Sequence, residues 1–418
     1  MKVFKFGGAS VKDAAGVRNL AKVLSHFPDD DLLIVVSAMG KTTNALEEVV
    51  WAWQRGGVVE DAIQALEDAH ADVLEAVSSG DSIALDQLRI GFEQLRSLTS
   101  KKPSGKPDLE YDQVVSFGEH WSTLIVSAHL KALGIDNTWL NAGDVVRTDD
   151  TFRSARVDWT ECERVAERRI KPLFAKGLGR IVTQGFIGRT EDGLTTTLGR
   201  EGSDFSAAIF AYLLDAESVT IWKDVPGMFN ADPKVFPDTK LLSHISYREA
   251  IELSYFGASV IHPRTLQPLQ KKHIPLYVRS FVDLSAPGST IDDRSENDSL
   301  IPSYIAKPNQ VLLSITPRDL SFVVEENLSG IFGLFSRHGV HVNMMQNSAL
   351  AFTVCMDNDN RVKPLVMELR RDYEVKWNEG LELLTVRHPD DATLAKLTTG
   401  RDVLLEQRSR TTARFVMK

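Results

Sequence analysis

The sequence predicts an α/β protein in which a parallel-rich sheet lies between layers of helices, followed by smaller ferredoxin-like α+β units. Residues 3–6 and 32–37 are apolar strand candidates, and the apolar residues over 11–27 have helical spacing. Strand, helix and strand in this order predict a right-handed βαβ unit and hence a parallel sheet. From about residue 309 the predicted order becomes βαββαβ, which is typical of small ligand-binding domains.

The elements between these two regions alternate in the same way. Residues 44–98 are helical in character, with breaks at Gly56-Gly57 and at Gly80. A loop rich in lysine, proline and glycine over 101–107 precedes a helix at 112–132. Further strands are predicted at 135–140, 180–183, 218–222 and 274–281, and the last of these ends the α/β pattern.

The C-terminal region is predicted to hold one complete and one abbreviated unit. The first has strands at 311–315, 340–346, 351–356 and 374–377, with helices at 328–338 and 362–371. The second has strands at 382–387, 403–407 and 413–416 and a short helix at 391–397. The second unit therefore resembles a shortened copy of the first.

Composition narrows the class of protein. A chain of 418 residues suggests two or three domains, and 43% hydrophobic with 25% charged residues is ordinary for a soluble globular protein. The net charge of −9 argues against nucleic acid as the main partner. No apolar run is long enough to span a bilayer, and no signal peptide is visible. Only Cys162 and Cys355 are present, which fits the reducing cytoplasm and argues against a disulfide framework.

The N-terminal strand leads directly into a possible anion site. Gly7 and Gly8 follow the strand, and Ser10 precedes the first helix. Glycines let backbone N–H groups approach a ligand closely, and the helix start adds a positive dipole. Lys5 would add a full charge. An ordinary glycine turn after a buried strand is the alternative.

A second polar loop follows the strand at 32–37. Gly40-Lys41-Thr42 invites a Walker A interpretation, but that motif requires glycine where Val35 stands. Ser37, Thr43 and Asn44 are therefore candidate ligand contacts at the end of a strand, or simple helix caps.

Two helix-associated segments carry charged candidates. Gly118 inside a helix suggests close approach by another group, and Glu119 beside it is either a partner for a cation or a solvated surface residue. Over residues 197–204, glycines bracket Arg200, whose planar guanidinium suits a carboxylate. Ser203 can cap the following helix, and Asp204 can orient a lysine or a metal, or complement the helix dipole.

The loop after the strand at 218–222 has the composition of a nucleotide contact. Asp224 and Phe229 could hold an adenosine, and Lys234 could reach its phosphates. An ordinary long surface loop is the alternative.

These segments, in this order, resemble the aspartate kinases of the amino-acid-kinase superfamily. The resemblance runs from residue 2 to about 305 and rests on the segments 5–11, Ser37 with Thr43-Asn44, Gly118-Glu119, 185–188, 197–204, 224–227, Asp232-Pro233, and 256–258 with His262-Pro263. The tail resembles the ACT regulatory domains of that family. The resemblance implies a carbamate-kinase-like catalytic domain at 1–305, with an aspartate side at about 1–200 and a nucleotide side at about 201–305. It also implies an ACT-type domain at 306–378 and an abbreviated one at 379–418.

The implied activity is ATP-dependent phosphorylation of the L-aspartate β-carboxylate, with Mg²⁺, at the entry to lysine, threonine and methionine synthesis. The implied catalytic residues are Lys5, Arg200 and Asp204. Aspartate would be bound by Thr43, Glu119, Arg200 and Ser203. The nucleotide would be bound by Lys5, Gly7, Gly8, Ser10, Ser37, Lys223, Asp224, Phe229 and Lys234. No residue is assigned as a metal ligand, and a homodimer formed through the tail is expected.

The sequence also departs from the family pattern. The family often has lysine where Ser259 stands, threonine where Lys223 stands and tyrosine where Phe229 stands, so Lys223 is a candidate to replace the missing lysine. In the tail, Asn343 and Asn347 stand where other members have effector-binding polar residues. The usual glycine before the first ACT helix is absent, which argues against feedback inhibition by lysine or threonine.

Two alternatives remain open. The first is a kinase of the same superfamily that acts on another amino acid such as glutamate, because Arg200 with Glu119 favours an α-amino acid without setting its length. The second is an amino-acid-sensing protein without catalysis. The presence of Lys5, Arg200 and Asp204 argues against the second alternative.

Overall fold

The computed structural model describes residues 1–177, 179–258, 261–319 and 321–418, so Ser259 lies outside the described residues. The chain forms two compact units. The first comprises Met1–Met228, Leu241–Ile251 and Val260–Ser295, and the second comprises Phe229–Lys240, Glu252–Ser259 and Glu296–Lys418. The predicted boundaries within the tail stay a prediction.

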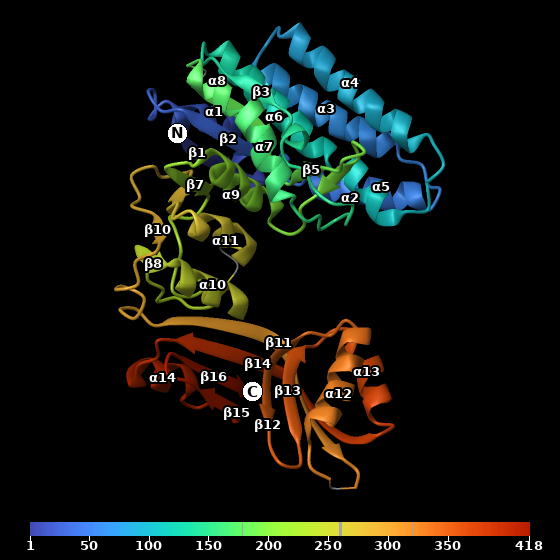
Figure 1. The fold of residues 1–418 in the computed structure, drawn as a ribbon, viewed down its shortest axis with the longest axis vertical. Coiled ribbons are helices and arrows are strands. Elements are labelled where there is room, and N and C mark those ends of the chain that lie inside the picture. Colours follow the sequence, from blue (N-terminus) through green and yellow to red (C-terminus); the bar gives the residue numbers. More distant parts are fainter. Residues whose placement is uncertain (178, 259–260, 320) are drawn as a thin grey trace. The chain divides into compact units, whose positions relative to one another are not determined.

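An eight-stranded sheet organises the first unit (Figure 1), in the order β3-β4-β2-β1-β7-β9-β10-β8. Its strands are β1 (Lys2–Phe6), β2 (Leu32–Val36), β3 (Thr138–Leu140), β4 (Arg180–Gln184), β7 (Ser218–Lys223), β8 (His244–Ser246), β9 (Leu276–Ser280) and β10 (Ser289–Asp292). All pairings among β3, β4, β2, β1, β7 and β9 are parallel. The predicted parallel-rich sheet is therefore confirmed.

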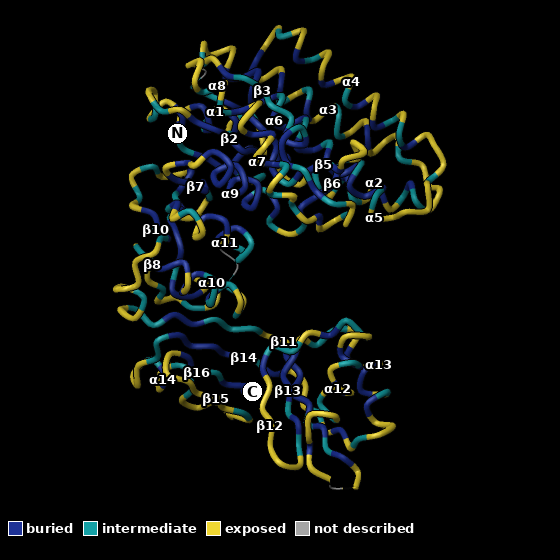
Figure 2. The backbone as a smooth tube through the Cα atoms, in the orientation of Figure 1, coloured by how far each residue is buried: buried dark blue, intermediate teal, exposed yellow. Residues whose placement is uncertain are grey.

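Helices cover both faces of this sheet. Those of the first unit are α1 (Ala14–Leu24), α2 (Thr42–Gln54), α3 (Glu60–Val77), α4 (Ser82–Thr99), α5 (Pro107–Val115), α6 (Phe117–Ala132), α7 (Trp159–Arg169), α8 (Lys171–Ala175), α9 (Gly202–Leu214) and α11 (Pro263–Lys271), while α10 (Tyr247–Phe256) has residues in both units. One core joins α1, α3, α4 and α6 to alternate residues of β1 and β2. The helix α9 packs on β1, β2 and β7, with α7 and α11 against it. The central strands β1, β2, β4 and β7 are buried along nearly all of their length, whereas α3 and α4 keep exposed faces (Figure 2).

Two expectations for the first unit are wrong in detail, and one hairpin was missed. The helix expected at 112–132 begins at Pro107 and is divided at Ser116 into α5 and α6. The strand β9 does not end the sheet, because β10 pairs with it and β8 pairs with β10. A short hairpin of β5 (Ile187–Arg189) and β6 (Thr195–Thr197) was also not predicted. These added strands have only three or four residues each, too few to show a period.

The second unit contains a six-stranded antiparallel sheet in the order β12-β13-β11-β14-β16-β15. Its strands are β11 (Ser303–Pro317), β12 (Val342–Asn347), β13 (Phe352–Asp357), β14 (Tyr373–Arg387), β15 (Val403–Arg408) and β16 (Thr412–Met417), and its helices are α12 (Glu325–Arg337), α13 (Val362–Leu369) and α14 (Asp391–Thr398). The strands expected at 374–377 and 382–387 are one strand, β14. It pairs with β11 on both sides of a register shift between Lys307 and Leu312, so the apparent turn between them is a bulge within one ladder.

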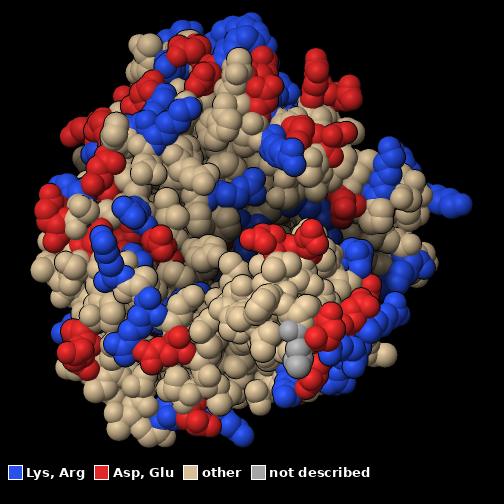
Figure 3. Space-filling view, turned by 60° about the horizontal axis from the view of Figure 1, so that its bottom comes forward, with Lys and Arg blue, Asp and Glu red and all other residues tan. Residues whose placement is uncertain are grey.

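Charges of both signs are distributed over the surface. Lysines and arginines alternate with acidic side chains across the face in Figure 3, where they do not gather in one basic region. None of the helices in the described part of the chain has the length and apolar character that a membrane span requires.

Candidate active site

The ends of four parallel strands lie side by side and lead into the candidate site. β4, β2, β1 and β7 are neighbours in this order, and they end at Gln184, Val36, Phe6 and Lys223. The chain leaves β1 for β2 on one side, while β7 pairs with β1 on the other side. Ligands of open α/β sheets bind at such a change of direction, beyond the carboxyl ends of the strands.

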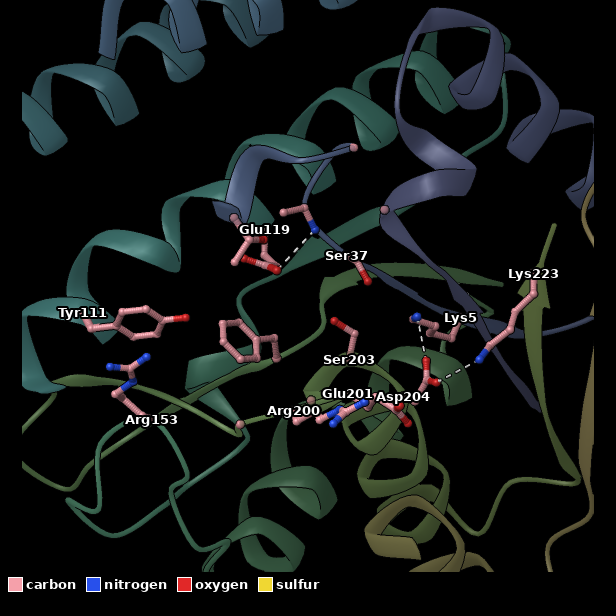
Figure 4. A pocket seen from close by; sticks show the side chains of 17 residues that line it. Lys5, Ser37, Tyr111, Glu119, Arg153, Arg200, Glu201, Ser203, Asp204 and Lys223 are labelled. Carbon is pink, nitrogen blue, oxygen red and sulfur yellow. Dashed lines mark hydrogen bonds and ion pairs between the residues drawn. The ribbon is translucent and has the colours of Figure 1, made fainter. Parts of the chain in front are cut away.

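A cavity of about 550 Å³ opens at this edge (Figure 4). Nine of the residues predicted for substrate or nucleotide line it: Lys5, Gly8, Ser37, Thr43, Glu119, Arg200, Ser203, Asp204 and Lys223. Other residues that line it are Ala38, Gly40, Tyr111, Arg153, Phe186, Gly199, Glu201 and Gly202. Segments that lie more than two hundred residues apart in the sequence, such as those of Lys5 and Lys223, therefore share one cavity.

One end of the cavity is basic. Lys5 Nζ lies 2.6 Å from Asp204 Oδ1, and Lys223 Nζ lies 3.9 Å from Asp204 Oδ2. Strand alternation explains the placement of Lys5, because Phe4 and Phe6 enter the core with α1 and α6 while Lys5 faces α9, where Asp204 stands in the first turn. Two ammonium groups and the N-terminus of α9 create a site suited to phosphate groups.

Close approach between loops requires glycine at two positions. A Cβ at Gly8 would lie 2.7 Å from the carbonyl oxygen of Ala38, and a Cβ at Gly185 would lie 2.5 Å from Cβ of Ser203. The carbonyl oxygen of Ala38 cannot yield at such a distance without moving its loop, and the half-buried Ser203 cannot yield by rotating its side chain, because its Cα would lie only 2.8 Å from a Cβ at Gly185. The glycines therefore bring the loops after β1 and β4 against the other walls of the site.

Glu119 is buried in the cavity wall, with 3% of its surface exposed, so its interpretation as a solvated surface residue is wrong. Its Oε1 accepts a hydrogen bond of 3.3 Å from the Ala38 N–H, and its Oε2 has no hydrogen-bond partner among the described residues. Burial raises the pKa of Glu119 to about 8, against the opposing effects of the Ala38 N–H and of Lys5. A buried carboxyl oxygen without a partner favours a cationic ligand group.

Gly118 explains why Glu119 is so deeply placed. A Cβ at position 118 would lie 3.0 Å from Cβ of Ala38 and 3.1 Å from Cγ2 of Thr42. The start of α6 therefore packs directly on the loop that follows β2. The prediction that this glycine marks a close approach agrees with the packing.

Arginine side chains line another part of the cavity. Arg200 is exposed to solvent, and its guanidinium makes no hydrogen bond or ion pair with any residue in the described ranges. The Arg153 guanidinium lies 4.0 Å from the centre of the Tyr111 ring, and Tyr111 Oη donates a 2.6 Å hydrogen bond to Glu47. Neither Tyr111 nor Arg153 was predicted from the sequence, because a lone arginine in an irregular loop carries no motif.

Five predicted nucleotide residues do not line the cavity. Ser10 is buried and donates to the Trp222 carbonyl at 3.4 Å, which ties the first turn to β7. Gly7 lies beside Lys5, and Asp224 is exposed after β7. Phe229 and Lys234 belong to the second unit. The nucleotide roles of these five residues stay predictions.

The two candidate effector residues lie on β12. Asn343 accepts a hydrogen bond from Lys307 at 3.1 Å and donates to Gln310 and Asp357 at 2.9 and 3.0 Å. Asn347 is exposed at the end of the strand. The amide of Asn343 thus has three protein partners.

No group of three or more histidine, cysteine, aspartate or glutamate side chains within residues 1–177, 179–258, 261–319 and 321–418 is arranged to hold a metal ion. Asp204 is a carboxylate on the cavity wall, and Lys5 and Lys223 face it.

Comparison with known proteins supplies the remaining observation. Residues 1–280 match the model of the amino acid kinase family. The lysine-sensitive aspartokinase 3 of Escherichia coli is 32% identical over 396 residues, which cover 92% of this chain and 86% of that one. The bifunctional aspartokinase/homoserine dehydrogenase 2 of Arabidopsis thaliana is 33% identical over 392 residues, but the match spans only 42% of its length. The crystal structure of E. coli aspartokinase III with aspartate and ADP aligns with a TM-score of 0.82 at 28% identity, covering 100% of this chain and 96% of that one.

Proposed function

Because this chain belongs to the amino acid kinase family, and within it to the aspartokinases, we infer that it transfers the γ-phosphoryl group of ATP to the β-carboxylate of L-aspartate. The product would be 4-phospho-L-aspartate, at the entry to lysine, threonine and methionine synthesis. The enzyme is proposed to act in the cytoplasm.

One observation supports this proposal above the others. A single cavity combines a basic end, formed by Lys5 and Lys223 around Asp204, with the buried carboxyl group of Glu119 and the guanidinium of Arg200, which has no partner among the described residues. The basic end suits phosphates, while Glu119 and Arg200 suit the ammonium and carboxylate of an amino acid. A carboxylate substrate placed between them would face the phosphoryl donor.

The residue types match the chemistry of acyl phosphate formation. A carboxylate is already a competent nucleophile, so the site needs no general base. Catalysis then consists of in-line positioning and of neutralising charge on the transferring group. We assign charge neutralisation to Lys5, held in place by Asp204, and substrate binding to Thr43, Glu119, Arg200 and Ser203.

The nucleotide is proposed to lie at the basic end. Gly7, Gly8, Ser10 and Ser37 would form its phosphate loop, and Lys223 would replace the lysine that the family often has where Ser259 stands. Asp224, Phe229 and Lys234 are proposed to contact the remainder of ATP.

Mg²⁺ fits this site as an ion carried by the phosphates of ATP. Mg²⁺ usually binds one or two carboxylates together with phosphates and waters, and Asp204 is a carboxylate at the basic end. The ion would neutralise part of the negative charge of the phosphates. Lys5 and Lys223 would neutralise the rest of that charge.

The tail is proposed to form a homodimer. β12 and β15 are the edge strands of the six-stranded sheet, and both expose apolar side chains, including Met345 and Leu404. Pairing with a second copy would cover such an edge. Sedimentation velocity of the full chain tests the dimer. Activity measured with lysine and threonine, separately and together, tests the expectation that they do not inhibit the enzyme.

The decisive assay is ADP release with Mg-ATP and either aspartate or glutamate, with the acyl phosphate trapped as a hydroxamate. Hydroxamate with aspartate but not with glutamate is the expected result. Hydroxamate with glutamate alone would favour the alternative that the enzyme phosphorylates glutamate. Absence of any product with aspartate would overturn the proposed function.

A further inference from the structure

Arg153 lies in the active-site cavity, but neither the fold of the strand ends nor a sequence motif explains its presence there. Figure 4 shows its guanidinium beside Tyr111, at the end of the cavity opposite Lys5 and Lys223. The 4.0 Å stacking on Tyr111 uses the flat face of the guanidinium. Because the donors of a guanidinium lie in its plane, stacking leaves its N–H groups able to bind an anion. Nη1 of Arg153 already lies 3.7 Å from Oδ1 of Asp108, and both side chains are exposed, so a bound carboxylate would compete only with this solvent-exposed pair.

The backbone of Arg153 is held in an uncommon conformation. Its φ angle is 65°, which is rare for a residue other than glycine. The Arg153 N–H donates to both carboxylate oxygens of Asp112, at 3.1 and 3.0 Å. Asp112 is fully buried, so this anchor is protected from water. Uncommon backbone angles persist where surrounding structure imposes them, and they are frequent at ligand sites.

The same carboxylate also anchors the loop that carries Arg200. Asp112 accepts hydrogen bonds from the Thr197 N–H at 2.8 Å and from Thr197 Oγ1 at 2.7 Å. Thr197 precedes Arg200 by three residues. A Cβ at Gly199 would lie 3.1 Å from the carbonyl oxygen of Arg153, so the two loops touch. One buried carboxylate therefore positions two arginines on the same cavity.

The geometry restricts what these arginines can bind. In the proposed reaction the β-carboxylate of aspartate faces the phosphoryl group, at the end with Lys5. The ammonium group is matched by Glu119. The α-carboxylate is then left for Arg200, which Figure 4 shows between the two ends of the cavity beside Glu201, and for Arg153 at the end opposite Lys5. A carboxylate can accept hydrogen bonds from two guanidinium groups, because its two oxygens offer about four acceptor sites.

Resting on this proposed function, we propose that Arg153 binds the substrate α-carboxylate together with Arg200 and thereby limits the length of amino acid that the cavity accepts. Aspartate and glutamate carry the same groups and differ by one methylene. Asp112 holds the backbone of Arg153 and Tyr111 stacks on its guanidinium, so the distance from this end to Lys5 becomes the selective feature. Arg153 would thus recognise the α-carboxylate, the end of the substrate that does not react.

The test compares wild type with Arg153→Gln, Arg153→Lys and the control Arg156→Gln. Arg156 lies on the same loop and carries the same charge, but it does not line the active-site cavity. Steady-state rates are measured by ADP release and hydroxamate trapping. The inhibition constant of β-alanine, which has the ammonium and reacting carboxylate of aspartate but lacks the α-carboxylate, is measured in competition with aspartate.

R153Q is expected to raise KM for aspartate between about tenfold and a hundredfold, the range for loss of a charged hydrogen bond. Its KM for ATP and its inhibition constant for β-alanine should stay unchanged, and the preference for aspartate over glutamate should fall. R153K should lie between wild type and R153Q, because lysine keeps the charge without the planar fork. R156Q should behave as wild type.

An unchanged KM for aspartate in R153Q would overturn the inference while leaving the proposed function intact. Equal weakening of aspartate and β-alanine would also overturn it, since that pattern indicates a structural role. A wild-type enzyme that forms no acyl phosphate from aspartate would remove the proposed function and this inference together. If R153Q does not fold, the same test is made with R153K: a raised KM for aspartate with an unchanged inhibition constant for β-alanine supports the inference, and any other pattern overturns it.

Discussion

Replacing Glu119 by glutamine should make the protein more stable and a poorer enzyme. The pKa of a glutamate side chain is ordinarily 4.5, and burial raises that of Glu119 to about 8. The folded protein therefore holds a proton that the unfolded chain releases above pH 4.5, and wild-type stability falls by about 1.4 kcal/mol for each pH unit between these values. Glutamine has the shape of the protonated group and no such dependence.

The size of the effect follows from the two pKa values. At pH 4 the free energies of unfolding of E119Q and wild type should be nearly equal. The variant should be more stable by about 3 kcal/mol at pH 7 and by about 5 kcal/mol at pH 9. With about 2 °C for each kcal/mol in a domain of this size, the melting temperatures should differ by about 6 °C at pH 7. Thermal unfolding followed by circular dichroism over this pH range measures the difference.

Glu110 provides a matched control of opposite sign. Burial raises its pKa, but hydrogen bonds from Ser104, Gln54 and the Gly105 N–H outweigh burial and bring the pKa below 4.5. Wild-type Glu110 therefore stabilises the fold at neutral pH, and this contribution disappears as the pH falls through its folded pKa. E110Q should be less stable than wild type at pH 7, with a gap that closes at low pH.

Enzyme kinetics supply the second measurement. Only ionised Glu119 attracts an ammonium group, so KM for aspartate should fall as the pH rises through about 8 in wild type. E119Q should show a KM for aspartate that is raised at least about tenfold and lacks this pH dependence, with KM for ATP unchanged. A stability difference between E119Q and wild type that does not vary with pH would refute the assignment of a buried, protonated Glu119.

Three further predictions concern other parts of the first unit and the two thiols. Lys5→Ala should lower turnover by about a thousandfold, because it removes a charge at the transferring group, while calorimetry still detects aspartate binding; turnover near that of wild type would contradict its role. Asp112→Asn should lower the free energy of unfolding by about 2–4 kcal/mol, because the new amide N–H faces donors such as that of Thr197; an unchanged melting temperature would count against the anchor. Burial raises the pKa of Cys162 and of Cys355 to about 12, so neither thiol should react with Ellman's reagent before unfolding; fast reaction of the folded protein would show that a thiol is accessible.

Local patterns in the sequence were sufficient to predict where β1 ends and which way Lys5 points. The strand at 3–6 followed by Gly7 and Gly8 predicts an anion loop at the end of a parallel strand, and β1 ends there. Because side chains alternate along a strand, Phe4 and Phe6 point into the core and Lys5 points to the other face of the sheet. The end of the strand and the direction of Lys5 could be predicted because they depend on neighbours within one strand and one turn, while anion binding by this loop stays a prediction.

The long strands of the second unit show where local patterns fail. Residues 378–380 have the composition of a turn, yet β14 runs through them from Tyr373 to Arg387. The continuous pairing with β11, interrupted only by a bulge, holds this segment in the sheet. A partner strand about seventy residues earlier in the chain decides the conformation, and no window around the segment contains that partner.

By itself, the sequence determined that this protein has a parallel α/β sheet, a glycine turn directly after the strand that carries Lys5, and an arginine bracketed by glycines. Only the tertiary structure decided that Glu119 is buried and that Arg153 belongs to the site. The Ala38 N–H that meets Glu119 is 81 residues away in the sequence, and the Thr197 hydroxyl that meets Asp112 is 85 residues away. Burial, pKa and the position of a loop arginine depend on contacts between such distant segments, which form only when the chain folds.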